Sequence, residues 1–198
     1  MIYLLILWLH QPYLVIKNID ADKQKEFLLL EKASRDYLTG LYNRGAGQER
    51  IDQFLQEQAA AGNEHTHVFL ILDLDDFKNL NDTFGHQMGD RALQEVADIL
   101  RSHFREYDII CRLAGDEFVV LIKNLPYDVI RKNTGILLRK LHLQYQRGQQ
   151  TVSISASAGV AVWPVHGTNF RELYEKADKA LYDAKEKGKK TYEIYNEI

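Results

Sequence analysis

Apolar positions along the chain follow two spacings, one typical of helices and one typical of strands, and segments of the two kinds alternate. Helical spacing predicts helices over residues 20–36, 47–61, 90–104, 127–146 and 170–187. Apolar and β-branched runs predict strands over residues 68–74, 108–113, 118–122, 152–162 and 192–195. The second and third strands are separated by only a tight turn, so they form a hairpin. This mixture favours a single α+β sheet with helices packed on it over a purely parallel, doubly wound sheet.

Residues 1–16 are apolar but contain a His-Gln-Pro sequence, and they are shorter than the ~20 residues that a membrane-spanning helix needs. They lack the basic start and the cleavage site of a signal peptide. Two β-rich runs, residues 3–9 and 13–16, predict a strand pair that belongs to another sheet. A packed arm or the remnant of a membrane anchor is the alternative.

Composition limits the chain to one compact domain and a short extra segment. It has 198 residues, of which 45% are hydrophobic and 27% are charged. The formal net charge of -3 argues against sequence-independent binding to a long nucleic acid, which depends on many cationic contacts. One cysteine, Cys111, forms no disulfide within the chain, and no Cys/His spacing indicates a zinc site. A small anionic ligand held by local charges is still compatible with this composition.

Acidic residues follow two of the predicted strands. The apolar strand at 68–72 ends in Asp73-Leu74-Asp75-Asp76, and the hairpin turns through Ala114-Gly115-Asp116-Glu117. The first group alone would be explained as the N-cap of a following helix. If the hairpin lies beside the first strand, however, Asp73 and Asp116 converge. Paired carboxylates that hold metal ions over a nucleotide triphosphate are what phosphoryl or nucleotidyl transfer requires.

Three ordered motifs carry a family resemblance: DYLTGLYNR at 36–44, DLDDFKNLNDTFGHQMGD at 73–90, and AGDEF at 114–118. With them, the chain resembles the GGDEF family of bacterial diguanylate cyclases from about residue 34 to residue 195. The resemblance implies an α+β fold with a central, mainly antiparallel sheet flanked by helices, similar to nucleotidyl cyclases and polymerase palms. It also implies that a homodimer condenses two GTP molecules into cyclic di-GMP and releases two pyrophosphates.

The resemblance assigns the acidic residues to metal binding and catalysis. It implies that Asp73, the backbone carbonyl of Leu74, Asp116 and Glu117 hold two Mg²⁺ ions per active site, with Mn²⁺ as a substitute. Asp116 and Glu117 are the implied catalytic residues. Glu117 either assists the second ion or activates the attacking 3′-hydroxyl.

The remaining implied substrate contacts are polar or basic residues and one glycine: Asn81, Asp90, Lys78, Gly115, Lys185 and Lys189. Asn81 and Asp90 match the positions that read guanine, because an amide and a carboxylate complement its N1–H and N2–H donors. Without the family, Asn81 would be a turn residue and Asp90 a helix N-cap. The lysines match contacts to the triphosphate, or else Lys185 and Lys189 belong to the solvated end of the last helix. The family commonly has arginine at position 189.

Arg105 and Asp108 resemble the family's RxxD inhibitory site, where cyclic di-GMP binds away from catalysis. An exposed ion pair at a helix end is the alternative. The resemblance thus makes cyclic di-GMP both product and inhibitor.

The clearest departure from the family is Ala114, which stands where the first glycine of the signature usually is. A positive φ there would strain alanine, whereas a negative φ would make the change harmless. An inactive hairpin would leave a regulatory domain that binds cyclic di-GMP or GTP. We expect an active enzyme, because the other motif residues are present.

We expect residues 34–198 to form the GGDEF domain and residues 1–33 to form an apolar segment and connector helix. Residues 13–20 resemble the exit strand of a PAS-like sensory domain, so an upstream sensor is expected. A dimerisation rod is the alternative for the connector helix. We expect a cytoplasmic location, with membrane tethering through the N-terminal or missing sequence as the alternative.

Overall fold

The computed structural model describes residue 25 and residues 29–62 and 65–195. It divides into two compact units, Met1–Arg35 and Asp36–Ile198. The strand pair expected at residues 3–9 and 13–16 lies outside the described residues.

In the first unit, Lys25 and residues 29–33 are helical. The helix ends where the Ser34 hydroxyl donates a hydrogen bond to the carbonyl oxygen of Glu31, at 2.7 Å. The prediction that this helix continues to residue 36 is therefore wrong at its C-terminal end. Serine competes well for nearby backbone carbonyls, which favours a helix end.

The second unit contains one six-stranded sheet. Its strands are β1 (His67–Asp75), β2 (Ile109–Ala114), β3 (Glu117–Ile122), β4 (Leu143–Arg147), β5 (Gln150–Trp163) and β6 (Tyr192–Ile194). The strand order is β2-β3-β1-β5-β4, and β6 also pairs with β5. All pairs are antiparallel except β5 with β6. The predicted α+β architecture with a mainly antiparallel sheet is confirmed.

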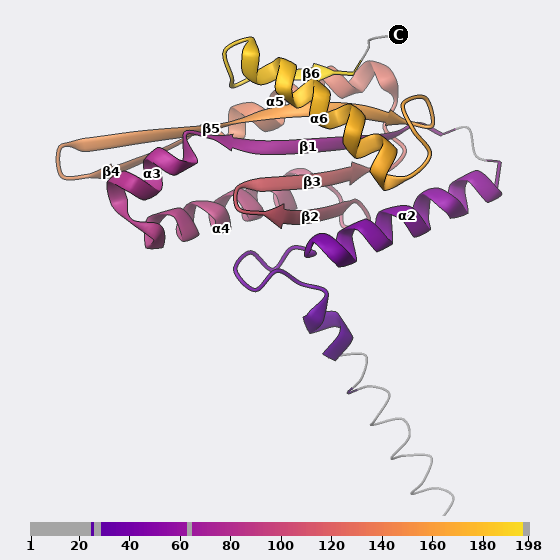
Figure 1. Cartoon of the computed structure of the whole chain (residues 1–198), viewed down its shortest axis with the longest axis horizontal. Coiled ribbons are helices and arrows are strands. Elements are labelled where there is room, and N and C mark those ends of the chain that lie inside the picture. The colour runs from indigo at the N-terminus through magenta and orange to yellow at the C-terminus, as the bar shows by residue number, and fades with distance from the viewer. Residues whose placement is uncertain (1–24, 26–28, 63–64, 196–198) are drawn as a thin grey trace, which may run out of the picture. The chain divides into compact units, whose positions relative to one another are not determined.

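Helices cover both faces of this sheet (Figure 1). They are α2 (Arg44–Ala60), α3 (Phe77–Phe84), α4 (His86–His103), α5 (Tyr127–Lys140) and α6 (Phe170–Glu186). One core lies between the sheet and α3, α4 and α5, and the other lies between the sheet and α2 and α6.

The central strand β1 contributes to both cores because successive side chains of a strand point to opposite faces. Leu70 and Leu72 pack in the first core, and Phe69 and Ile71 pack in the second. A strand buried on both faces reads as a continuous apolar run, which is why the sequence predicts it well.

Two elements differ from the sequence prediction. The helix predicted over 127–146 ends at Lys140, and residues 143–147 form β4 against the first part of β5. The eight-residue helix α3 was anticipated only in the alternative that the acidic residues 73–76 cap a following helix, and Asp76 does stand at its N-cap position. Both segments are short, so each offers too few positions for spacing to define the element.

Helix α6 packs very closely on the sheet at Gly159 of β5. A Cβ atom built on Gly159 would lie 1.9 Å from the carbonyl oxygen of Ala177 in α6. Figure 1 shows α6 in front of β5 and β1. The absence of a side chain at this one position thus lets the backbone of α6 approach the strand around Ala177 and Leu181.

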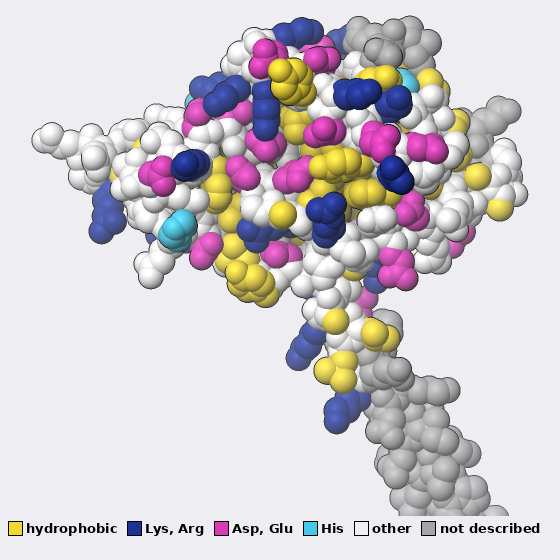
Figure 2. Space-filling view, viewed as in Figure 1, with side chains coloured by type: hydrophobic (Ala, Val, Ile, Leu, Met, Phe, Trp, Pro, Cys, Tyr) yellow, Lys and Arg dark blue, Asp and Glu magenta, His cyan; other side chains and the backbone are white. Residues whose placement is uncertain are grey.

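Charged side chains of both signs are interspersed on the face seen in Figure 2, so that face carries no large patch of a single sign. Among the described residues, none of the helices is long and apolar enough to cross a membrane.

Candidate active site

The acidic hairpin lies directly beside the end of β1. β1 and β3 pair antiparallel, with Asp73 opposite Glu117. The backbone N–H of Leu74 donates to the carbonyl oxygen of Asp116 at 3.3 Å. The structure therefore brings together the four residues that the sequence suggested as metal ligands.

The turn of the hairpin is held by its glycine and by an arginine. Gly115 has a φ of +53°, whereas Ala114 is not among the residues with positive φ and pairs with Glu117. Arg112 donates from Nε to the carbonyl oxygen of Gly115 at 2.9 Å. Its Nη1 also lies 3.1 Å from Oδ1 of Asp36, in an ion pair that is largely buried.

Negative charge is concentrated at this site. Burial raises the pKa of Asp116 above its ordinary value, and the nearby charge of Asp73 raises it further. Burial also raises the pKa of Glu117, to which Asp73 and Asp178 add, against the lowering effect of a hydrogen bond from Tyr174. A cation placed among these carboxylates would relieve the repulsion.

Basic residues at the end of α6 already meet the aspartates at the end of β1. The ammonium Nζ of Lys185 lies 2.7 Å from Oδ1 of Asp73, and Nζ of Lys189 lies 3.0 Å from Oδ1 of Asp76. Within the described part of the chain, Lys78 on α3 is exposed and forms no ion pair with this cluster. The structure thus joins two of the three predicted phosphate-binding lysines to the acidic site.

Asp75 has a role that the sequence reasoning missed. It is only 3% exposed, and its carboxylate accepts hydrogen bonds from the hydroxyls of Ser155 and Ser157, each at 2.8 Å. It also accepts the backbone N–H of Lys190 at 3.2 Å. Asp75 therefore ties the end of β1 to β5 and to the loop after α6. Serines in alternate positions of β5, at 153, 155 and 157, were the available signal.

Tyr174 of α6 is a second residue that the sequence reasoning missed. Its hydroxyl donates to Oε1 of Glu117 at 2.8 Å, and its ring stacks on Phe170. Burial and the neighbouring Glu117 raise the pKa of Tyr174 to about 12, so it remains a hydrogen-bond donor at neutral pH. Tyr174 packs against the core beside α6, and its helical spacing gives no sign of a contact with Glu117.

The two predicted guanine contacts lie on neighbouring helices. Asn81 lies in α3, and its Oδ1 is buried without a hydrogen-bond partner in the described structure. Asp90 is exposed in α4. Asn81 is thus not a turn residue. Asp90 is not an N-cap either, because α4 begins at His86 and Gly85 caps it.

The RxxD motif lies outside this site. Asp108 is 7% exposed, and its two oxygens accept the backbone N–H groups of Arg105 and Lys123, both at 2.9 Å. The alternative of an exposed ion pair at a helix end is therefore wrong. The Arg105 side chain is exposed and donates from Nη1 to the hydroxyl of Tyr107.

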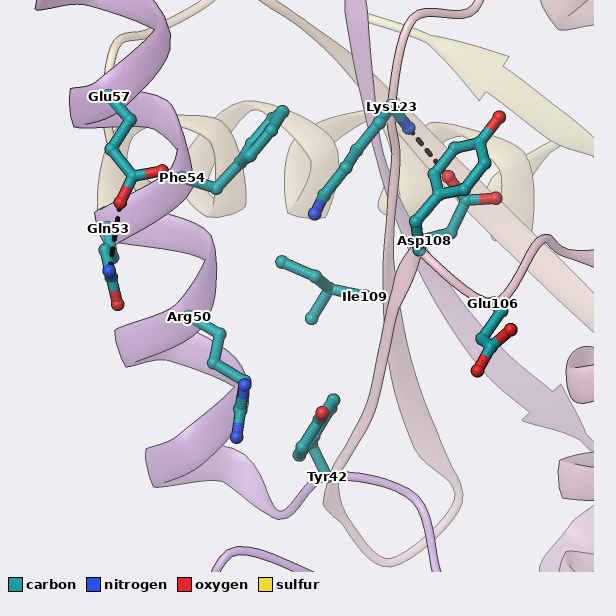
Figure 3. Close-up of a pocket in the computed structure, with 10 residues that line it drawn as sticks. Tyr42, Arg50, Gln53, Phe54, Glu57, Glu106, Asp108, Ile109 and Lys123 are labelled. Carbon is teal, nitrogen blue, oxygen red and sulfur yellow. Dashed lines mark hydrogen bonds between the residues drawn. The ribbon is translucent and has the colours of Figure 1, made fainter.

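A pocket of about 280 Å³ lies between α2 and the strands beside this motif (Figure 3). Tyr107, Asp108 and Lys123 line it from one side, and α2 contributes Arg50 and Phe54. The Lys123 ammonium lies 4.2 Å from the centre of the Phe54 ring.

The acidic site suits an ion that is shared with a substrate. In the described chain, no group of three or more His, Cys, Asp or Glu side chains is arranged to hold a metal ion by itself. Mg²⁺ does not need such a group, because one or two carboxylates, water and substrate phosphates complete its shell. The repulsion among Asp73, Asp116 and Glu117 fits a site that is completed by a metal–nucleotide complex.

Comparison with known proteins agrees with these motifs. The family described as "Diguanylate cyclase, GGDEF domain" matches residues 33–191. The bifunctional diguanylate cyclase/cyclic di-GMP phosphodiesterase MucR of Pseudomonas aeruginosa is 38% identical over 164 residues, covering 83% of this chain and 24% of MucR. The response regulator PleD of Caulobacter vibrioides is 35% identical over 166 residues, covering 81% of this chain and 36% of PleD. The chain thus spans about a quarter to a third of the length of these relatives.

A solved structure extends the likeness to three dimensions. The coiled coil and GGDEF domain of DgcB from Caulobacter crescentus, in complex with c-di-GMP, superposes with a TM-score of 0.79 at 25% identity. The match covers 93% of this chain and 98% of that one. From its motifs, its fold and these relatives, we conclude that the chain belongs to the GGDEF family of diguanylate cyclases.

Proposed function

We propose that this domain is an active diguanylate cyclase that condenses two GTP molecules into cyclic di-GMP and releases two pyrophosphates. The observation that supports this most directly is the arrangement at the end of β1. There, Asp73 of β1 and Glu117 of β3 lie opposite each other on neighbouring strands, and Lys185 contacts Asp73. Carboxylates and cations in one small site suit a substrate that carries both a triphosphate and divalent metal.

In this proposal, Asp73, the carbonyl of Leu74, Asp116 and Glu117 hold two Mg²⁺ ions. When bound, the metal neutralises charge on the phosphates and makes the 3′-hydroxyl more acidic. Lys185 and Lys189 exchange their aspartate partners for phosphate oxygens, and Lys78 approaches from α3.

Glu117 accepts the proton of the 3′-hydroxyl as the bond from O3′ to the α-phosphorus forms. The bond from that phosphorus to pyrophosphate then breaks. Burial raises the pKa of Glu117 in the metal-free site, and a bound cation would lower it again, so the role of Glu117 as a base rests on its place opposite Asp73. Tyr174 fixes one oxygen of this carboxylate at 2.8 Å and thereby limits its rotation.

Joining two nucleotides requires two loaded domains that face each other, because each site supplies one GTP. We therefore propose a catalytic homodimer. Residues 34–198 would form the cyclase, and residues 1–33 would connect it to an upstream sensor. Correct apposition of two sites raises the effective concentration of the reacting groups, so control of dimer geometry would control the rate.

The test is to incubate the purified chain with GTP and Mg²⁺ and to analyse the products by chromatography. Cyclic di-GMP should form with the wild type and be lost with Glu117→Gln. Glu49→Gln is the matched control, because it makes the same change on the exposed surface of α2. Lack of product, together with tight binding of cyclic di-GMP, would instead support a regulatory domain. A competition binding experiment tests base selectivity. If ATP displaces bound GTP as well as unlabelled GTP does, the guanine roles of Asn81 and Asp90 are contradicted.

We also propose that cyclic di-GMP inhibits the enzyme through Arg105 and Asp108. An exposed guanidinium can grip a phosphate or a guanine edge, and the adjacent pocket offers room beside the motif (Figure 3). Added cyclic di-GMP should lower turnover in the wild type and in Arg147→Ala, an exposed control on β4, but not in Arg105→Ala. Equal inhibition of all three would contradict this site. Asp108 is the poorer position to mutate, because it holds two backbone N–H groups.

A further inference from the structure

Gly89 lies in the first part of α4 and is buried. It is not among the glycines with positive φ, so its backbone conformation is one that alanine adopts readily. Alanine is also the better helix former. Neither backbone conformation nor helix propensity therefore explains a glycine at this position.

The space around Gly89 does explain it. A Cβ atom built there would lie 1.9 Å from Oδ1 of Asn81, 2.9 Å from its Cγ and 3.2 Å from its Nδ2. Turning the amide over would exchange nitrogen for oxygen and leave the overlap in place. A side chain at position 89 would thus force the Asn81 amide out of its position on α3.

The Asn81 amide lies directly against Gly89 of α4. Its Oδ1 is buried and has no partner in the described part of the chain. A buried carbonyl oxygen without a partner is costly in a protein interior, and a bound ligand that donates a hydrogen bond would satisfy it.

We propose that Gly89 is a positioning residue for base recognition, because the gap left by its missing side chain sets the orientation of the Asn81 amide. This inference rests on the proposed function, in which Asn81 reads guanine. It assigns Gly89 a steric role in nucleotide specificity through Asn81.

A double-mutant cycle tests this coupling, with Gly89→Ala, Asn81→Ala and the double variant in the full chain. Binding is measured with GTP and ATP analogues that carry a non-hydrolysable α,β-methylene bond, in the presence of Mg²⁺. Gly89→Ala should weaken binding of the guanosine analogue about tenfold, as expected for loss of one hydrogen bond, and leave the adenosine analogue unchanged. Asn81→Ala should have a similar effect, and the double variant should bind no more weakly than Asn81→Ala.

Thermal unfolding provides a readout that is independent of nucleotide. In the Asn81→Ala background, Gly89→Ala should raise the midpoint, because alanine then has space in the helix. Gly135→Ala is the matched control: it lies in α5, where the nearest atom to its Cβ is 3.6 Å away. It should raise the midpoint in the wild type and leave nucleotide binding unchanged.

The outcomes separate this inference from the proposed function. If Asn81→Ala does not weaken guanosine binding, the guanine role of Asn81 is wrong, although the coupling in thermal unfolding can still be observed. If Asn81→Ala weakens binding and Gly89→Ala does not, or if their losses add, the positioning role is overturned. If Gly89→Ala alone does not fold, recovery of folding in the double variant supports the role and continued failure overturns it.

Discussion

The alanine in the AGDEF signature provides a sharp test of whether the hairpin is intact. Ala114 does not have a positive φ, and it pairs with Glu117 in the ladder. Alanine is therefore unstrained here, and glycine would only add freedom to the unfolded chain. We expect Ala114→Gly to lower the free energy of unfolding by about 0.5–1 kcal/mol. An alanine held at positive φ would give the opposite sign, a gain of about 1–2 kcal/mol.

Gly115 is the matched position, because its φ is +53° and no heavy atom lies within 4 Å of a Cβ built on it. The cost of Gly115→Ala thus comes from the backbone alone and should be about 1–2 kcal/mol. Comparing the two variants distinguishes a backbone position that requires glycine, 115, from one that does not, 114.

Urea unfolding measures both changes, and cyclic di-GMP formation is followed in parallel. With a typical urea dependence of about 2 kcal/mol per M, Ala114→Gly should lower the midpoint by roughly 0.3–0.5 M. Its turnover should stay within about twofold of the wild type, because neither Asp116 nor Glu117 has to move. A higher midpoint, or a tenfold gain in turnover, would refute the conclusion that alanine fits this hairpin.

Three further changes test the site and the stability of the domain that carries it. Tyr174→Phe removes the hydrogen bond that lowers the pKa of Glu117, so the acid limb of the pH–rate profile should move to higher pH; an unmoved limb would show that the bond does not affect the reaction. Gly159→Ala should destabilise the domain by about 3 kcal/mol or more in urea unfolding, because its Cβ would overlap the Ala177 carbonyl, and a wild-type midpoint would contradict this packing. Burial lowers the pKa of His67 to about 4. The unfolded chain binds this proton near pH 6.5, so stability should fall from pH 6.5 to pH 4, and His67→Gln should flatten that part of the curve.

The sequence predicted best those elements in which the pattern of burial stays the same over several consecutive residues. β1 is buried on both faces for most of its length, so its apolar run is unmistakable, and the pairing of β2 with β3 follows from their short turn. β4 was missed because its residues are partly or fully exposed and its conformation depends on a partner strand. No local pattern contains that information.

The same limit applies to the site. The motifs suggested Asp73, Asp116 and Glu117 as site residues without reference to the rest of the fold. The Tyr174 contact with Glu117 joins residues 57 positions apart in the chain. The contact depends on where α6 packs along the strands of the sheet, and only the tertiary structure determines that position.

Strand periodicity explains why α6 meets the acidic groups. Asp73 and Asp75 continue the alternation of Phe69 and Ile71, so they lie on the face of the sheet that α2 and α6 cover. Glu117 lies opposite Asp73 and belongs to the same face. A lysine and a tyrosine of α6 can therefore contact carboxylates from two strands at once.

Two glycines, Gly159 and Gly89, influence the proposed nucleotide site, because a side chain at either position would not fit. At Gly159, the strand lets α6 approach and bring Lys185 to the carboxylate end of the site. At Gly89, α4 leaves room for Asn81 on α3, where the base is proposed to bind. The carboxylates can be moved only slightly by neighbouring side chains, because paired strands hold their backbones. We therefore expect differences in phosphate contact among related chains to follow from how closely α6 approaches the sheet. We expect differences in base selectivity to follow from how closely α4 approaches α3.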